Sequence, residues 1–359
     1  LDEFNLGTNR VRVVDVATNT EIYSRGFCTL FQEWQSTEEA TKFKRCYEES
    51  VSVPLPKNKA HIKIDQRNYE GIFEEVFSME YDPAEIFVTP EQRYSFPVYE
   101  AMVNGDPAKQ VDIVIIPDGY TQEEMGKFIS DCDAFVDVLE TFEPFASNIQ
   151  NFSVRGVMAP SVDSGTDVPR NDVWKNTIVD CHFDTFYSDR YNTTDSYFAL
   201  KDVAACAPYD QIYILVNSDI YGGGGIYNYY SVSTSGNISS AKVIIHEFGH
   251  AFAGLADEYT GDVSYNDYYN LNIEPWEFNI TSLVDFDSKW KFMLDKKTPV
   301  PTPATEKYIG KLGVFEGAGY ITKGMYRPSY DCLMNTFRND VFCDACKYMI
   351  NRMIEAHVK

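Results

Sequence analysis

The spacing of apolar and polar residues divides the chain into two parts. Up to about residue 100, short segments alternate apolar with polar side chains, which is the period of half-buried β-strands. These segments are Val11–Val16, Val51–Leu55 and His61–Asp65. Turn-forming residues separate them, and a series of short strands with turns between them is typical of a β-sandwich. We therefore predict a small all-β sandwich at the N-terminus.

Further along the chain, the pattern becomes that of an α/β protein. Val111–Pro117 and Gln211–Asn217 are nearly continuous apolar runs, as expected of strands that are covered on both faces. Between Val111–Pro117 and the next apolar run, Phe152–Met158, apolar residues recur with helical spacing from Met125 to Leu139. A strand, a helix and a second strand predict a parallel pair.

Two further features complete this prediction. Thr121 and Glu124 form a capping-box pattern that should open the helix after the first strand. Tyr227–Thr234 has the character of an exposed strand, and Cys346–Ile354 that of a closing C-terminal helix. The second part is therefore expected to be an α/β or α+β domain.

The boundary between the two parts is expected near Pro107. Asn104-Gly-Asp-Pro107 combines two turn-forming pairs, and the hydrophobic periodicity stops around it. A chain of 359 residues is also longer than a single hydrophobic core usually serves. We predict a β-sandwich domain over residues 1–107 and a second domain over residues 108–359.

Composition and charge narrow the class of protein. The formal net charge is −23, which argues against nucleic acid or an anionic membrane as a partner. Apolar runs stay well below membrane-spanning length, so we expect no membrane span. Because the chain begins with Leu1, we expect that an export signal has been removed and that the protein is secreted, periplasmic or anchored to the cell envelope. The oligomeric state stays open.

The most informative segment is His246-Glu-Phe-Gly-His250. On a helix, residues four apart lie on the same face, so His246 and His250 can bind one metal ion while Glu247 faces a water molecule at that ion. The alternative is an amphipathic helix with two core histidines. Because the chain has only five histidines, chance placement of this pattern is unlikely to explain it, and we predict a Zn²⁺ site.

Gly254 and Asp257 continue the motif. The segment resembles the metzincin pattern, in which a glycine turns the chain so that a third ligand returns to the metal; here the glycine and the acidic residue are both displaced by one place. This resemblance implies Asp257 as the third ligand and Gly254 as the structural turn. Glu258 is the alternative third ligand, or else a solvated charge beside Asp257.

Other candidate residues lie on both sides of this segment. Gly222, Gly223, Gly224, Gly225 and Ile226 form either a flexible turn or a sheet edge to which an extended peptide substrate could add. Cys343-x-x-Cys346 suggests a redox pair or half of a zinc clip, but with no second such pair we favour a local disulfide or buried thiols. Met334 lies either in a core loop or in a turn below the metal.

Four segments in one order carry a specific resemblance: Asp112–Thr121, Ser164–Pro169, His246–Tyr259 and Cys332–Cys346. Together they resemble the bacterial IgA-peptidase family of zinc metallopeptidases. The resemblance implies a metzincin-like catalytic domain behind an N-terminal β-sandwich, and Met334 as the methionine of the turn below the metal. No residue indicates the cleavage sequence, so immunoglobulin A as a substrate does not carry over.

The sequence thus predicts a zinc-dependent endopeptidase that acts on protein or peptide substrates. Glu247 is the expected general base for the attacking water. Tyr326 or Tyr330 is a candidate for stabilising the oxyanion, and the sequence does not choose between them. The alternative function is a non-catalytic envelope protein that binds a glycan or protein and retains a structural metal site.

Overall fold

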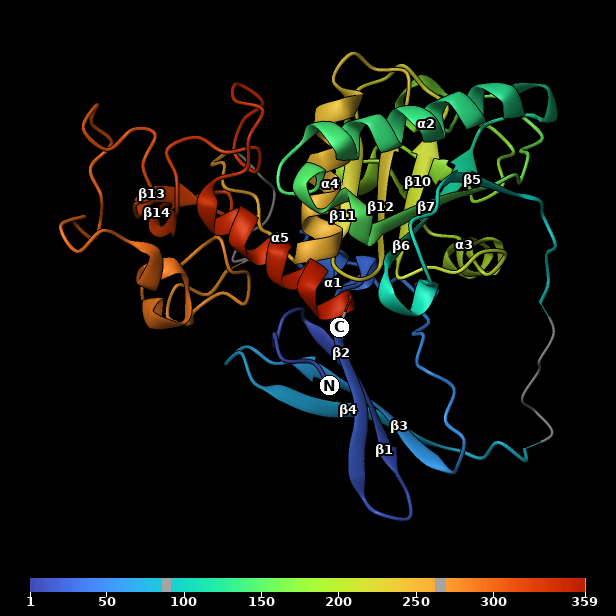
Figure 1. Ribbon diagram of the computed structural model, residues 1–359, viewed down its shortest axis with the longest axis horizontal. Coiled ribbons are helices and arrows are strands. Elements are labelled where there is room, and N and C mark those ends of the chain that lie inside the picture. The colour runs from blue at the N-terminus through green and yellow to red at the C-terminus, as the bar shows by residue number, and fades with distance from the viewer. Residues whose placement is uncertain (86–91, 262–268, 359) are drawn as a thin grey trace.

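The computed structural model describes residues 1–85, 92–261 and 269–358. An N-terminal antiparallel sheet lies below a larger α/β body, and an irregular lobe lies beside that body (Figure 1). The strands of the N-terminal sheet follow the spatial order β2-β1-β3-β4. Their bounds are Asn9–Asp15 (β1), Thr20–Phe27 (β2), Ala60–Arg67 (β3) and Phe73–Tyr81 (β4), and a short helix, α1 (Leu30–Gln35), follows β2.

The N-terminal prediction is correct for strands but wrong for the sandwich, because the described residues 1–85 form one sheet. Val51–Leu55 is also not a strand: its segment runs extended along the larger body, where Lys201 donates a hydrogen bond of 2.9 Å to Ser52. Alternation of side chains indicates a strand but not which partner covers its apolar face.

A six-stranded sheet in the order β11-β12-β10-β6-β7-β5 forms the centre of the body. Strands β12, β10, β6 and β7 are parallel, and the edge strands β11 and β5 are antiparallel to their neighbours. The predicted parallel pair on either side of a helix is confirmed. The strands are Val98–Met102 (β5), Val111–Asp118 (β6), Phe152–Val157 (β7), Gln211–Val216 (β10), Gly223–Ile226 (β11) and Tyr230–Thr234 (β12).

Two of these strands differ from expectation. β5 precedes the boundary predicted near Pro107, yet it pairs with β7 in the large sheet, so we assign β5 to the second part. β12 was expected to be exposed, but it lies between β10 and β11 and all its residues are buried. Its polar side chains find internal partners: Ser233 accepts a hydrogen bond of 2.9 Å from Tyr213.

Helices cover both faces of this sheet. Alternate residues of β6 point to opposite faces. Ile113 and Ile115 pack in the core with α2, α4 and α5, whereas Val114 and Ile116 pack in a second core with α3. The capping box of Thr121 and Glu124 is present at the start of the helical segment that leads into α2. The helices are Met125–Thr141 (α2), Tyr197–Ala204 (α3), Ser240–Ala253 (α4) and Asp344–His357 (α5).

The remaining regular structure is short. The strand pairs are Cys181–His182 (β8) with Thr193–Thr194 (β9), and Phe315–Ala318 (β13) with Ile321–Arg327 (β14). Short 3₁₀ helices span Glu39–Thr41, Pro107–Lys109, Gln122–Glu124, Ala146–Asn151, Pro169–Asn171, Thr185–Tyr187, Phe286–Ser288 and Trp290–Met293. Among the described residues, no helix has both the length and the apolar character that crossing a membrane requires.

The N-terminal sheet is attached to the body through the turn between β11 and β12. The backbone N–H of Cys28 donates to the carbonyl of Tyr227 at 2.9 Å. Arg25 donates to the side chain of Asn228 at 2.7 Å, and Asn228 donates in turn to the carbonyl of Gly26 at 2.8 Å. The end of β2 and helix α1 are thereby held beside β11.

Candidate active site

Helix α4 carries the histidine pair. Its apolar residues Ile244, Ile245, Phe248 and Phe252 are buried in the core against the sheet, which fixes the rotation of the helix. One helical turn separates His246 from His250, so both imidazoles emerge on the same side, and their Nε2 atoms lie 3.1 Å apart.

The chain returns to the histidines directly after α4 ends. Gly254 ends the helix in the left-handed region, at φ = +60°, a conformation that glycine adopts without steric cost. The turn brings Asp257 back over the helix, where its Oδ1 atom lies 3.1 Å from Nε2 of His246 and 3.4 Å from Nε2 of His250. Three potential ligand atoms thus form a nearly equilateral triangle.

The triangle has dimensions that are compatible with a divalent metal, and each imidazole presents its Nδ1 atom to a backbone carbonyl. Nδ1 of His246 lies 2.9 Å from the carbonyl oxygen of Leu333, and Nδ1 of His250 lies 2.5 Å from that of Leu255. Donation from Nδ1 leaves the Nε2 lone pairs free for a metal. Ligand atoms about 2.0–2.1 Å from a tetrahedral zinc lie about 3.3 Å apart. Oδ1 of Asp257 is buried, and apart from these imidazoles it has no hydrogen-bond donor among the described residues.

Glu258 points away from the histidines. Its side chain is completely buried, where Asn279 donates to its Oε1 atom at 3.0 Å and the thiol of Cys346 lies 3.2 Å from the same atom. The expectation of a solvated charge is therefore wrong, and the arrangement does not favour Glu258 as the third ligand. Consecutive residues of an extended segment point to opposite sides, which separates Asp257 from Glu258.

The loop with Met334 supports the site from below. Met334 is completely buried, and its sulfur packs against α4 at Gly249. The preceding residue, Leu333, supplies the carbonyl that faces His246, and the carbonyl of Met334 accepts a hydrogen bond of 2.7 Å from the backbone of Glu258. The loop thereby contacts both the helix and the segment that carries Asp257.

The glycine run forms the edge strand β11 rather than a flexible turn. A Cβ atom on Gly223 would lie 2.7 Å from Val243, and one on Gly225 would lie 2.2 Å from the backbone oxygen of Glu247. On the opposite face, a Cβ on Gly224 would lie 2.5 Å from the ring of Tyr191. Glycine is therefore required because α4 and Tyr191 approach the strand from its two faces.

Comparison with known protein families identifies the chain over most of its length. The model described as IgA Peptidase M64 matches residues 100–309 and 304–354, and the model described as Peptidase M64 N-terminus matches residues 1–78. The chain belongs to the IgA Peptidase M64 family. It is a peptidase, and its substrates are proteins. No curated protein matches the chain.

In this M64 peptidase, the histidine pair opens into a cleft of about 2330 Å³ between the N-terminal part and the peptidase body. His246, Glu247, His250 and Asp257 all line it. Gly223, Gly224, Gly225 and Ile226 also line the cleft, whereas Gly222 lies outside its lining. Tyr326 and Tyr330 are not among the described residues that line the cleft.

Three residues of the cleft lining, Glu33, Arg190 and Tyr320, were missed by sequence reasoning. Tyr320 donates its hydroxyl to Oδ2 of Asp257, and Arg190 donates to the hydroxyl of Tyr259 at 3.2 Å. Glu33, on α1, accepts a hydrogen bond from Tyr191. These residues come from segments far apart in the sequence, and none belongs to a local motif. Only the fold brings them to the M64 site.

The electrostatics of the site distinguish its carboxylates. Burial raises the pKa of Glu247, although both histidines act in the opposite direction. Burial would also raise the pKa of Asp257, but the two histidines, when they are protonated in the metal-free site, outweigh it and hold that pKa well below its usual range. Burial raises the pKa of Glu33 to about 7. Glu247 therefore has the character of a base that can exchange a proton, and Asp257 that of a permanent anion.

Proposed function

We propose that the chain is a zinc-dependent endopeptidase in which His246, His250 and Asp257 hold the metal and Glu247 is the general base. The observation that carries the proposal is the triangle of two Nε2 atoms and Oδ1 of Asp257, with sides of 3.1, 3.1 and 3.4 Å. When bound, Zn²⁺ would polarise the scissile carbonyl and lower the pKa of the attacking water.

The protein residues supply proton transfer and alignment. Glu247 takes the proton of the attacking water and delivers it to the leaving amine, a role that suits a carboxylate whose pKa burial has raised. Tyr320 holds Asp257 through its Oδ2 atom, which orients Oδ1 toward the metal position. Because Tyr326 and Tyr330 do not line the cleft, we replace them with Arg190 as the candidate for stabilising the oxyanion.

The edge of β11 is the proposed binding surface for the substrate backbone. At Gly223 this edge is already bonded by the segment 190–192, because Gly223 donates to Arg190 at 3.1 Å and accepts from Asn192 at 3.4 Å. Backbone groups of alternate residues point to the same side of a strand, so those of Gly225 face the same edge. We propose that an extended peptide adds there, beside Glu247.

The decisive test is Glu247→Gln. The variant should keep its metal content and lose cleavage of a proteome-derived peptide library by about 10²–10⁴-fold, since only the proton acceptor is removed. His246→Ala and Asp257→Asn should lose both the metal at this site and cleavage. Glu123→Gln, which removes an exposed carboxylate on the surface, is the control and should match the wild type.

Full activity in Glu247→Gln would refute the mechanism. Wild-type protein that binds peptides or glycans but cleaves none of them would favour the alternative of a non-catalytic binding protein. Location outside the cytoplasm stays a prediction that fractionation of the producing cells would test.

A further inference from the structure

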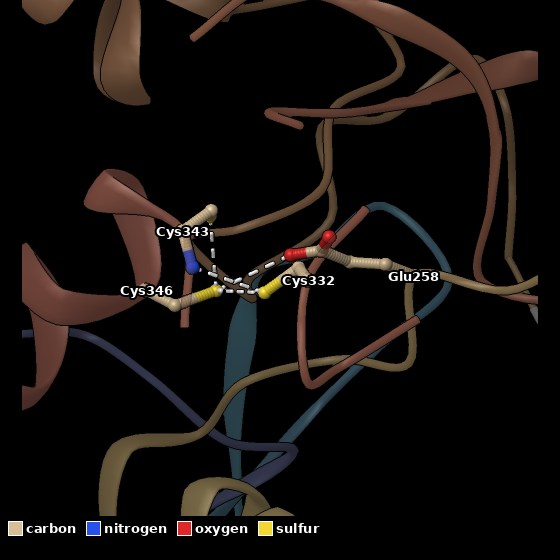
Figure 2. Close-up of side chains that lie close together, drawn as sticks. All are labelled: Glu258, Cys332, Cys343 and Cys346. Atoms are coloured by element: carbon tan, nitrogen blue, oxygen red, sulfur yellow. Dashed lines mark hydrogen bonds between the residues drawn. The ribbon is translucent and has the colours of Figure 1, made fainter. Parts of the chain in front are cut away.

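A second cluster of potential metal ligands lies behind the active site. Glu258, Cys332, Cys343 and Cys346 are all buried, and their ligand atoms all lie within 4.8 Å of one another. Figure 2 shows the carboxylate of Glu258 directed at the sulfur atoms. The residues come from three segments: the chain after Asp257, the loop that carries Met334, and the start of α5.

The spacing of the sulfur atoms suits a metal ion. Sγ of Cys346 lies 3.5 Å from Sγ of Cys343, 3.8 Å from Sγ of Cys332 and 3.2 Å from Oε1 of Glu258. Thiolates about 2.3 Å from a tetrahedral zinc lie about 3.8 Å from one another. A disulfide would require a separation of about 2.05 Å. All eight cysteines of the chain lie in the described residues and are free thiols.

The cluster also contains a buried oxygen atom that a cation would satisfy. Oε2 of Glu258 is buried without a hydrogen-bond partner among the described residues. A disulfide between two of the cysteines would leave the third thiol and Oε2 of Glu258 buried without a partner, which is unfavourable. One divalent cation would account for all four side chains together.

The surrounding backbone favours negatively charged sulfur. The N–H of Cys343 donates to Sγ of Cys332 at 3.2 Å. Cys343 is the N-cap of α5 and Cys346 lies in its first turn, where the helix dipole stabilises thiolates. Asn279 donates to Oε1 of Glu258 and thereby orients the carboxylate.

We propose that Glu258, Cys332, Cys343 and Cys346 form a structural zinc site that is separate from the catalytic one. Four buried protein ligands leave no position for a substrate, which is the arrangement of a structural site. The ion would join three segments, two of which position residues of the active site. Glu258 follows Asp257, and Leu333, the residue after Cys332, presents its carbonyl to Nδ1 of His246. The pair Cys343-x-x-Cys346 would thus supply two of the four ligands, and Cys332 and Glu258, which are distant in sequence, would supply the other two.

The test is the metal content of the full chain, purified without chelator. The wild type should contain two equivalents of zinc. The double variant His246→Ala/His250→Ala should contain one, and this readout does not depend on the peptidase mechanism. Cys332→Ser and Cys346→Ser should also contain one equivalent, whereas Cys132→Ser, which removes a buried thiol elsewhere, should retain two.

Two further measurements give their main readout on the wild type, so the test does not depend only on the folding of the cysteine variants. After cobalt replaces zinc, thiolate-to-cobalt charge-transfer absorption should appear and should persist in the histidine double variant. Protein denatured without reductant should show eight reactive thiols. A zinc content of one that falls to zero in the histidine variant, or a thiol count of six, would overturn the proposal.

Discussion

Strand β11 packs closely against helix α4 at Gly225, and Gly225→Ala tests this contact. The added Cβ would lie 2.2 Å from the backbone oxygen of Glu247 and 3.0 Å from Cβ of His250. Carbon and oxygen atoms normally approach to about 3.3 Å, so the helix and the strand must separate by about 1 Å. Because both atoms are close to the helix backbone, a change of side-chain rotamer would not relieve the overlap.

The separation should affect both stability and activity. Overpacking of this kind typically lowers the free energy of unfolding by ~1–3 kcal/mol. A displacement of about 1 Å at a catalytic group can reduce the rate about 100-fold, and the displaced helix carries Glu247 and both histidines. We therefore expect kcat/KM for peptide cleavage to fall by about 100-fold while the secondary structure is retained.

Gly126→Ala is the matched control, because Gly126 lies in α2 and a Cβ there would meet no atom within 4 Å. Alanine is the better helix former, so this variant should gain ~0.5–1 kcal/mol in stability and keep its activity. Urea unfolding followed by circular dichroism, together with kcat/KM on a cleaved peptide, measures both effects. A Gly225→Ala variant with wild-type stability and kcat/KM would refute the inferred contact.

Two further predictions concern the hydrogen bonds around the site. Tyr320→Phe removes the hydrogen-bond donor to Asp257 and should weaken metal binding or peptide cleavage by about 10–100-fold. Tyr326→Phe changes a residue outside the cleft lining and should leave both unchanged. Competition with a metal indicator measures the metal affinity of both variants. Burial raises the pKa of Glu33 to about 7, so the folded protein holds this proton more tightly than the unfolded chain does. The stabilisation that results is fully present below about pH 4.5 and is lost as the pH rises through 7. Relative to the wild type, Glu33→Gln should therefore become more stable across that interval in urea titrations, and an unchanged difference would contradict the burial of this carboxyl. The groups that face Glu33 are Tyr191, Glu247, His250 and Asp257.

The sequence predicts those elements whose pattern is repeated within a few residues. β6 and β10 are recognisable because strands covered on both faces are apolar throughout. β12 was misjudged because its hydroxyl groups suggested exposure, yet Ser231 and Ser233 are buried beside internal hydrogen-bond partners. Whether a hydroxyl is satisfied by water or by the protein is set by tertiary contacts, which a local pattern does not contain.

The difference between local patterns and tertiary contacts also explains which site residues could be predicted. His246, Glu247 and His250 are recognisable because a helix fixes their relative positions from sequence spacing alone. Arg190, Tyr320 and Glu33 were missed because they reach the cleft from three separate segments. The cysteine cluster was recognised only at Cys343 and Cys346, because Cys332 and Glu258 reach it through the fold.

The direction of two adjacent side chains connects the two proposed metal sites. Asp257 points to the histidines and Glu258 to the cysteines, as alternation along an extended segment requires. A shift of this segment by one residue would exchange the two carboxylates and disrupt both ligand sets. The hydrogen bond from the backbone of Glu258 to the carbonyl of Met334 opposes such a shift. Zinc in the cysteine cluster would fix Glu258 by its side chain, and the position of Asp257, the adjacent ligand of the proposed catalytic metal, would then depend on a metal ion that does not itself take part in the reaction.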